Sequence, residues 1–152
     1  MWTSLLFGCA LRSTVVGLVE PVGNVTFVVS YNGTRTPVVL SAESAPLRRL
    51  DGCVVEVAGL RAPAGLIVQD WFVRDAGDGS GGFVGTLQAY GGRITIADRN
   101  TENTVFLDDL SALQLRPYVG RPVLLIGSIV GNGVVSVGAW RLLDEAAPVE
   151  PR

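Results

Sequence analysis

The side chains able to do chemistry in this chain are carboxylates, arginines and two cysteines. The 152 residues include 14 Asp or Glu and 12 basic residues, all of them arginine, with no lysine and no histidine. Lysine nucleophiles, phosphate-loop lysines, histidine general bases and histidine zinc ligands are therefore excluded. We expect a protein that is not an enzyme and that uses no cofactor.

The densest group of carboxylates lies around one predicted hairpin and comprises Asp98, Glu102, Asp108 and Asp109. Carboxylate oxygens are ligands for Ca²⁺, but this spacing matches no calcium-binding loop. We interpret the group as a solvated, charged hairpin and expect no metal site.

The first cysteine ends a short apolar stretch, Leu6-Phe7-Gly8-Cys9. The stretch resembles the lipobox of bacterial lipoproteins, in which the chain is cleaved before the cysteine and its thiol carries a lipid. The resemblance implies lipid attachment at Cys9, a membrane anchor, and a location in the bacterial cell envelope, periplasmic or at the outer membrane. The alternative is a soluble protein in which residues 1–11 form an apolar arm. Cys53 starts an apolar run, so we expect it to be a buried small side chain.

The charge balance argues against a polyanionic partner. The formal net charge is −2, and the arginines are scattered along the chain. Binding to a phosphate backbone needs a basic stripe that neutralises several phosphates. A nucleic-acid partner is therefore not expected.

An internal repeat organises the chain. At an offset of 68 residues, two segments keep the same order of turn, glycine and strand, and one extra residue later in the second copy aligns Trp71 with Trp140. The aligned identities include the pairs Gly17/Gly85, Asn32/Asn100, Gly59/Gly127 and Gly65/Gly133. Self-similarity at a fixed offset predicts two copies of one structural unit.

The boundaries follow from composition. We predict an amino-terminal arm over residues 1–11, a first unit over 12–75, a glycine-rich flexible linker over 76–82, a second unit over 83–144 and a flexible tail over 145–152. Each unit is only marginally stable alone by its size, so we expect the two to pack on each other or on a partner.

Each unit is predicted to contain five short strands, because runs rich in Val, Ile and Phe are separated by Gly, Pro and Asn. The predicted strands are 14–20, 24–31, 36–40, 53–60 and 66–74 in the first unit, and 83–89, 93–98, 104–107, 122–129 and 134–143 in the second. One or two helical turns are expected at 44–50 and 110–116, between the third and fourth strands. This all-β order, with a glycine inside each first strand, resembles the OB-fold and implies two tandem five-stranded barrels. Other small five-stranded barrels and one sandwich of about ten strands are the alternatives.

The OB-fold resemblance implies a ligand face on the second and third strands and their flanking loops. Six residues are candidates for ligand binding: Tyr31, Arg35, Trp71, Tyr90, Arg93 and Trp140. The alternative is structural, with Phe27 facing the barrel interior, Tyr31 at the rim of a hairpin, and the two tryptophans packing in the core or between the units.

The sequence therefore favours a non-enzymatic binding or scaffolding module of the cell envelope, lipid-anchored, that acts through contacts with protein or glycan. One alternative is a structural subunit of a virion, filament or other assembly, in which the chain binds a protein partner or itself. Another is an OB protein that binds single-stranded nucleic acid.

Overall fold

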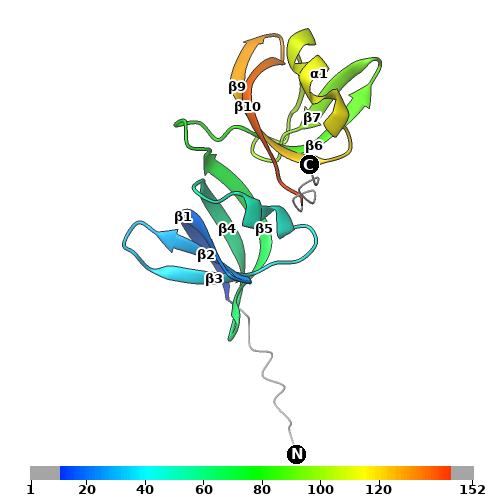
Figure 1. The fold of residues 1–152 in the computed structure, drawn as a ribbon. Helices are drawn as coiled ribbons and strands as arrows, with labels where there is room; N and C mark the ends of the chain where they lie inside the picture. The colour runs from blue at the N-terminus through cyan, green and yellow to red at the C-terminus, as the bar shows by residue number, and fades with distance from the viewer. Residues whose placement is uncertain (1–10, 145–152) are drawn as a thin grey trace, which may run out of the picture.

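The computed structural model describes residues 11–144, and ten strands form most of this length (Figure 1). The first five are β1 (Arg12–Val22), β2 (Val25–Ser30), β3 (Arg35–Val39), β4 (Val54–Ala62) and β5 (Gly65–Asp75). The second five are β6 (Phe83–Tyr90), β7 (Arg93–Ala97), β8 (Thr104–Leu107), β9 (Pro122–Gly131) and β10 (Val134–Leu142). A 3-10 helix, η1 (Ala45–Arg49), lies between β3 and β4, and α1 (Asp109–Leu115) with η2 (Arg116–Tyr118) lies between β8 and β9. The prediction of a mostly β protein is confirmed.

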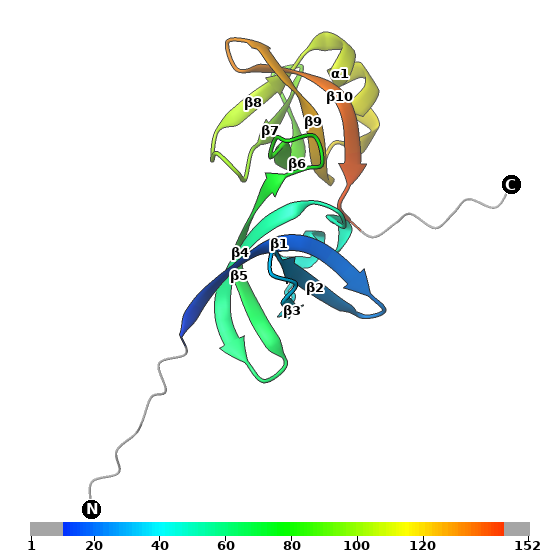
Figure 2. The same cartoon turned by 90° about the vertical axis from the view of Figure 1, so that its left-hand side faces the viewer.

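Each half of the chain forms a five-stranded sheet that closes on itself. The strand order is β1-β2-β3-β5-β4 in the first sheet and β6-β7-β8-β10-β9 in the second, and the last strand of each pairs with the first. The pairs β3–β5 and β8–β10 are parallel, and the other pairs are antiparallel. We call the two sheets barrel 1 and barrel 2, and Figure 2 shows barrel 2 above barrel 1.

The repeat extends to the register of individual strand pairs. Gly17 lies opposite Val55 in barrel 1, and Gly85 lies opposite Val123 in barrel 2. The same offset of 68 relates the parallel pair Val38–Leu66 to the pair Phe106–Val134. Residues that are 68 positions apart in the sequence therefore occupy equivalent positions in the two barrels.

Glycine is required where two backbones approach closely at the repeat positions. A Cβ atom on Gly17 would lie 2.2 Å from the carbonyl oxygen of Val29, and one on Gly85 would lie 2.3 Å from that of Ala97. Real side chains never approach a backbone atom so closely, so only glycine fits where the first strand of each barrel coils over the second.

Alternation along β1 separates the core from the outer wall of barrel 1. Val15, Gly17 and Val19 are buried, whereas Val16 and Leu18 point outward and are exposed. One buried cluster lies wholly within barrel 2. The other fills barrel 1 and also contains residues of barrel 2, namely Val84, Leu124 and Leu143. The two barrels therefore share part of one core.

The glycine-rich segment between the barrels is held against them, which differs from the free linker expected from composition. Ala76 is 6% exposed and belongs to the shared core, and its N–H donates to the carbonyl of Ser80 at 2.6 Å. The side-chain amide of Asn100 donates to the carbonyl of Gly81 at 2.9 Å. The glycine-rich composition predicts the turns in this segment, but it does not predict the contacts that the two barrels make with it.

The helices of the described residues are short. None between residues 11 and 144 has the length and apolar character needed to cross a bilayer.

Candidate functional site

The joint between the barrels is built around Trp71, which lies near the end of β5 and is 3% exposed. Its indole N–H donates to the carbonyl of Glu43 at 3.4 Å. Arg99, from the segment after β7, lies over the indole ring at 4.3 Å from its centroid and donates from Nε to the backbone carbonyl of Trp71 at 2.8 Å. Trp71 therefore anchors barrel 1 to barrel 2.

Two further residues of barrel 2 form hydrogen bonds across the joint. Asn100 accepts a hydrogen bond from the backbone N–H of Val73 at 2.8 Å. Arg141, on β10, donates to the carbonyls of Arg49 and Asp51 at 3.0 and 2.9 Å. Side-chain groups of barrel 2 thus satisfy backbone groups of barrel 1, which orients the two barrels as well as attaching them.

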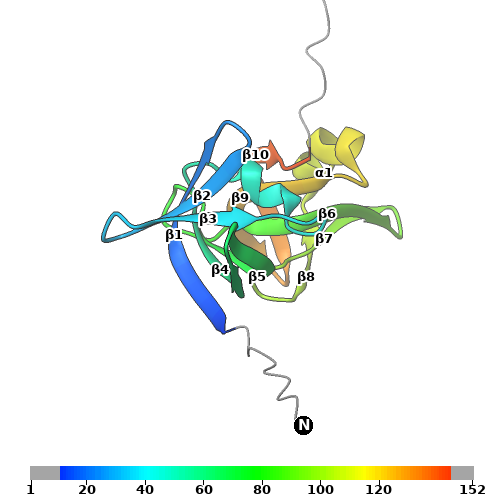
Figure 3. The same cartoon turned by 90° about the horizontal axis from the view of Figure 1, so that it is seen from below.

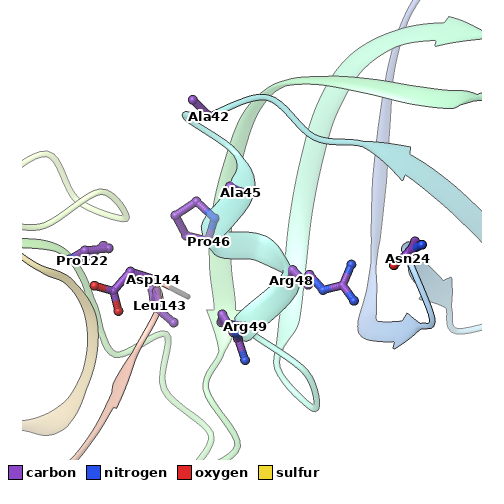
Figure 4. A pocket seen from close by; sticks show the side chains of 9 residues that line it. All are labelled: Asn24, Ala42, Ala45, Pro46, Arg48, Arg49, Pro122, Leu143 and Asp144. Atoms are coloured by element: carbon purple, nitrogen blue, oxygen red, sulfur yellow. The ribbon is translucent and has the colours of Figure 1, made fainter. Parts of the chain in front are cut away.

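A cleft of about 610 Å³ opens at one side of the joint (Figure 4). Arg48 and Arg49 of η1 line one wall, and Leu143 and Asp144 line the other. Arg48 donates to the carbonyl of Gly23. The Arg48 guanidinium therefore holds η1 to the turn between β1 and β2.

Asp144 has its own partner at the edge of the cleft. Arg121 donates to both of its carboxylate oxygens, at 2.6 and 2.7 Å. This bidentate hydrogen bond holds the pKa of Asp144 below its ordinary value.

The expectation of a solvated acidic hairpin is wrong for Asp98, whereas Glu102 and Asp109 are exposed. Asp98 is 2% exposed and accepts hydrogen bonds from the N–H of Val84 at 2.9 Å and from the hydroxyl of Thr101 at 2.8 Å. Asp108 instead caps α1 by accepting from the N–H of Ser111 at 2.9 Å, and hydrogen bonds from Ser111 lower its pKa. Within residues 11–144 no group of three acidic or sulfur ligands could hold a metal ion.

The candidate arginines lie on the face formed by the second and third strands of each barrel, and each stacks on a phenylalanine. Arg35 lies 4.4 Å from the ring centroid of Phe27 and pairs with Glu20 at 3.0 Å. Arg93 lies 4.6 Å from the ring centroid of Phe106. The expectation that Phe27 faces the interior is wrong, because its neighbours Thr26 and Val28 are the buried residues of β2.

The four aromatic candidates do not gather into one site. Trp71 is enclosed at the joint, whereas Tyr90 at the end of β6 is 74% exposed. Trp140 is 39% exposed, and its ring centroid lies 6.4 Å from that of Tyr118. Tyr31, which follows β2, is fully exposed. Aromatic surface is thus present at several separate places.

An apolar groove of about 390 Å³ crosses the outer wall of barrel 1 and was not identified from the sequence. It is lined by residues 16–18 of β1, residues 29–31 and Val54. Val16 is 45% exposed and Leu18 is 47% exposed. Figure 3, seen from below, shows β1 along the side of barrel 1. The sequence signal is that β1 carries apolar residues at both its inward and its outward positions.

The structure describes only one of the two cysteines that the sequence singled out. Cys9, the predicted site of lipid attachment, lies outside the described residues. Cys53 is fully buried immediately before β4 and forms no disulfide with any of residues 11–144. Burial raises the pKa of its thiol, which disfavours the reactive thiolate.

Comparison with known proteins gives no relative. No family model, no curated protein and no solved structure matches the chain.

Proposed function

We propose that this protein is a non-enzymatic scaffolding module, built from two OB-like barrels, that binds protein through the outer wall of barrel 1. The OB assignment is supported by the strand order and by the parallel pair of the third and fifth strands in each barrel. The glycines at the coiled first strands support it further.

The observation that carries the function is the exposed apolar groove of barrel 1. Val16 and Leu18 of β1 and Tyr31, which follows the adjacent strand β2, present their side chains to solvent. Exposed apolar side chains that lie together form a candidate binding surface in a soluble domain. Tyrosine is also enriched at protein interfaces, because its ring is apolar and its hydroxyl is polar.

The test is site-specific photo-cross-linking in cells that express the full chain. A photoreactive amino acid at position 18 should give protein adducts. The same amino acid at position 67 is the control, because Ile67 is a similarly exposed apolar residue on β5, with 42% exposed against 47% for Leu18. Equal yields at the two positions, or no protein adduct at position 18, would overturn the proposal.

A second candidate is glycan binding, which the Phe27–Arg35 and Arg93–Phe106 pairs favour because sugars stack on aromatic rings beside hydrogen-bond donors. It is tested by titrating the chain with chitotetraose and, separately, with a thymidine oligonucleotide. Binding of the sugar that is lost in Phe27→Ala supports this role. Binding of the oligonucleotide alone, weakening with salt, supports the nucleic-acid alternative instead.

The envelope location and lipid anchor remain predictions from the segment that ends at Cys9. Mass spectrometry of protein extracted from membranes tests them. A diacylglyceryl group on Cys9 supports the anchor, and an intact, unmodified segment overturns it.

A further inference from the structure

The groove on barrel 1 has a counterpart on barrel 2, and barrel 1 packs against that counterpart. On barrel 2 the equivalent surface is formed by residues 84–86, residues 97–99 and Pro122, and Trp71 of barrel 1 lines it from the other side. Subtracting 68 from each of these numbers gives residues 16–18, residues 29–31 and Val54, which are the residues that line the groove of barrel 1. The two grooves are therefore the same surface of the repeated unit.

The groove on barrel 2 is partly covered, with Thr86, the equivalent of Leu18, still exposed, whereas the groove on barrel 1 is open. Val84 is 2% exposed because barrel 1 packs on it, whereas its equivalent Val16 is 45% exposed. Arg99 lies over the ring of Trp71, whereas Tyr31, at the equivalent position, is fully exposed. Barrel 1 thus presents a docking surface that in barrel 2 receives a tryptophan-bearing barrel.

The matching tryptophan is also available. Trp140 is the repeat equivalent of Trp71, and the two lie opposite the equivalent residues Leu125 and Val57. Trp71 is 3% exposed at the joint, whereas Trp140 is 39% exposed. Within residues 11–144, barrel 1 therefore carries the open copy of this groove and barrel 2 carries the partly exposed copy of this tryptophan.

We propose that copies of this chain associate head to tail, with Trp140 of one copy docking in the groove formed by residues 16–18, residues 29–31 and Val54 of the next. This inference rests on the proposed function and names its partner as a second copy of the chain. The occupant follows from the structure, because the contact between copies repeats the contact that already joins barrel 1 to barrel 2. Such a contact is heterologous, so it extends into a filament or closes into a ring.

The contact between copies is expected to be weaker than the internal joint. Leu124 and Leu143 contribute to the shared core of the joint, but barrel 1 has Glu56 and Arg74 at the equivalent positions, paired with each other at 2.9 Å. The internal joint also holds its barrels at high effective concentration because they belong to one chain. Assembly should therefore depend on protein concentration.

The test is sedimentation velocity of the full chain over a concentration series, with variants of the two surfaces. The wild type should grow in mass as concentration rises. Leu18→Glu places a charge in the apolar groove, and Trp140→Ala removes the docking tryptophan. Each variant alone should therefore remain a monomer. Ile67→Glu and Tyr90→Ala are matched controls on other exposed surfaces, and both should assemble like the wild type.

Mixing the two variants identifies the geometry. In the mixture, Trp140 of the Leu18→Glu chain can dock in the intact groove of the Trp140→Ala chain, so a dimer forms that cannot extend. A wild type that stays monomeric overturns the proposal. A mixture that stays monomeric also overturns it, because docking of Trp140 in the groove predicts that the two variants form a dimer with each other. Circular dichroism of each variant confirms folding.

The cross-linking experiment separates the two proposals. Adducts at position 18 that contain only a different protein support the scaffolding function and overturn self-association. Absence of any protein adduct overturns both.

Discussion

Trp71→Ala should destabilise the protein much more than Trp140→Ala, although the two residues occupy equivalent positions in the repeat. Trp71 is 3% exposed and Trp140 is 39% exposed. A tryptophan side chain can bury about 250 Å², and burial of apolar surface contributes about 25 cal/mol per Å². The greater burial of Trp71 therefore corresponds to ~2 kcal/mol of additional loss in the free energy of unfolding. The absolute loss for Trp71→Ala should be about 3–5 kcal/mol, as for other large side chains removed from a core.

The assay is unfolding in urea followed by far-ultraviolet circular dichroism, because the variants remove a fluorophore. Trp71→Phe is the intermediate variant, since it retains an aromatic ring beside Arg99 but loses the indole N–H that bonds to Glu43. The dependence of the free energy on urea should stay similar among the variants, so that the midpoints can be compared. Equal losses in the free energy of unfolding for the two alanine variants would refute the reasoning, because they would show that burial of Trp71 at the joint adds nothing to the stability of the protein.

Three further changes test the framework and the joint. Gly59→Ala should cost ~3 kcal/mol, since its Cβ would lie 1.9 Å from a carbonyl oxygen of β5, whereas Gly138→Ala meets nothing closer than 3.7 Å and should be nearly neutral in the same urea assay. Asn100→Ala should cost about 1–3 kcal/mol by leaving the N–H of Val73 without its partner, and hydrogen exchange of that amide should accelerate. Asp144 has a lowered pKa through its hydrogen bonds with Arg121, so it stabilises the fold above the ordinary carboxyl pKa and loses this effect as pH falls through the lowered value. Asp144→Asn should therefore be less stable than the wild type at neutral pH, and thermal melts should show the difference shrinking in acid. A pH-independent difference would contradict this assignment.

The strands could be predicted from the sequence because their signals are local. Apolar runs form the strands, and Asn32-Gly33 marks the turn between β2 and β3. The repeat added the order of elements, since the same sequence of strand and turn recurs after 68 residues. These signals need no knowledge of which strands meet in space.

The environments of single side chains could not be predicted in the same way. Asp98 is polar and lies among other acids, but the N–H of Val84 and the hydroxyl of Thr101 satisfy its carboxylate in the interior. Phe27 belongs to an apolar run without alternation, so its outward orientation depends on the register with neighbouring strands. The N–H of Val84 reaches Asp98 from 14 residues away, and the orientation of Phe27 is set by pairing across the sheet.

The comparison of Val16 with Val84 shows what the repeat does and does not encode. The same residue stands at the same place on the same backbone, yet it is 45% exposed in barrel 1 and 2% exposed in barrel 2. The fold of a single barrel therefore leaves this position on the outer wall, and only the packing of another barrel buries it. Because barrel 1 retains valine there with no barrel packed on it, the apolar surface is not explained by the internal core. The proposed contact with a second copy of the chain would account for this exposed surface, and the two variants Leu18→Glu and Trp140→Ala test it.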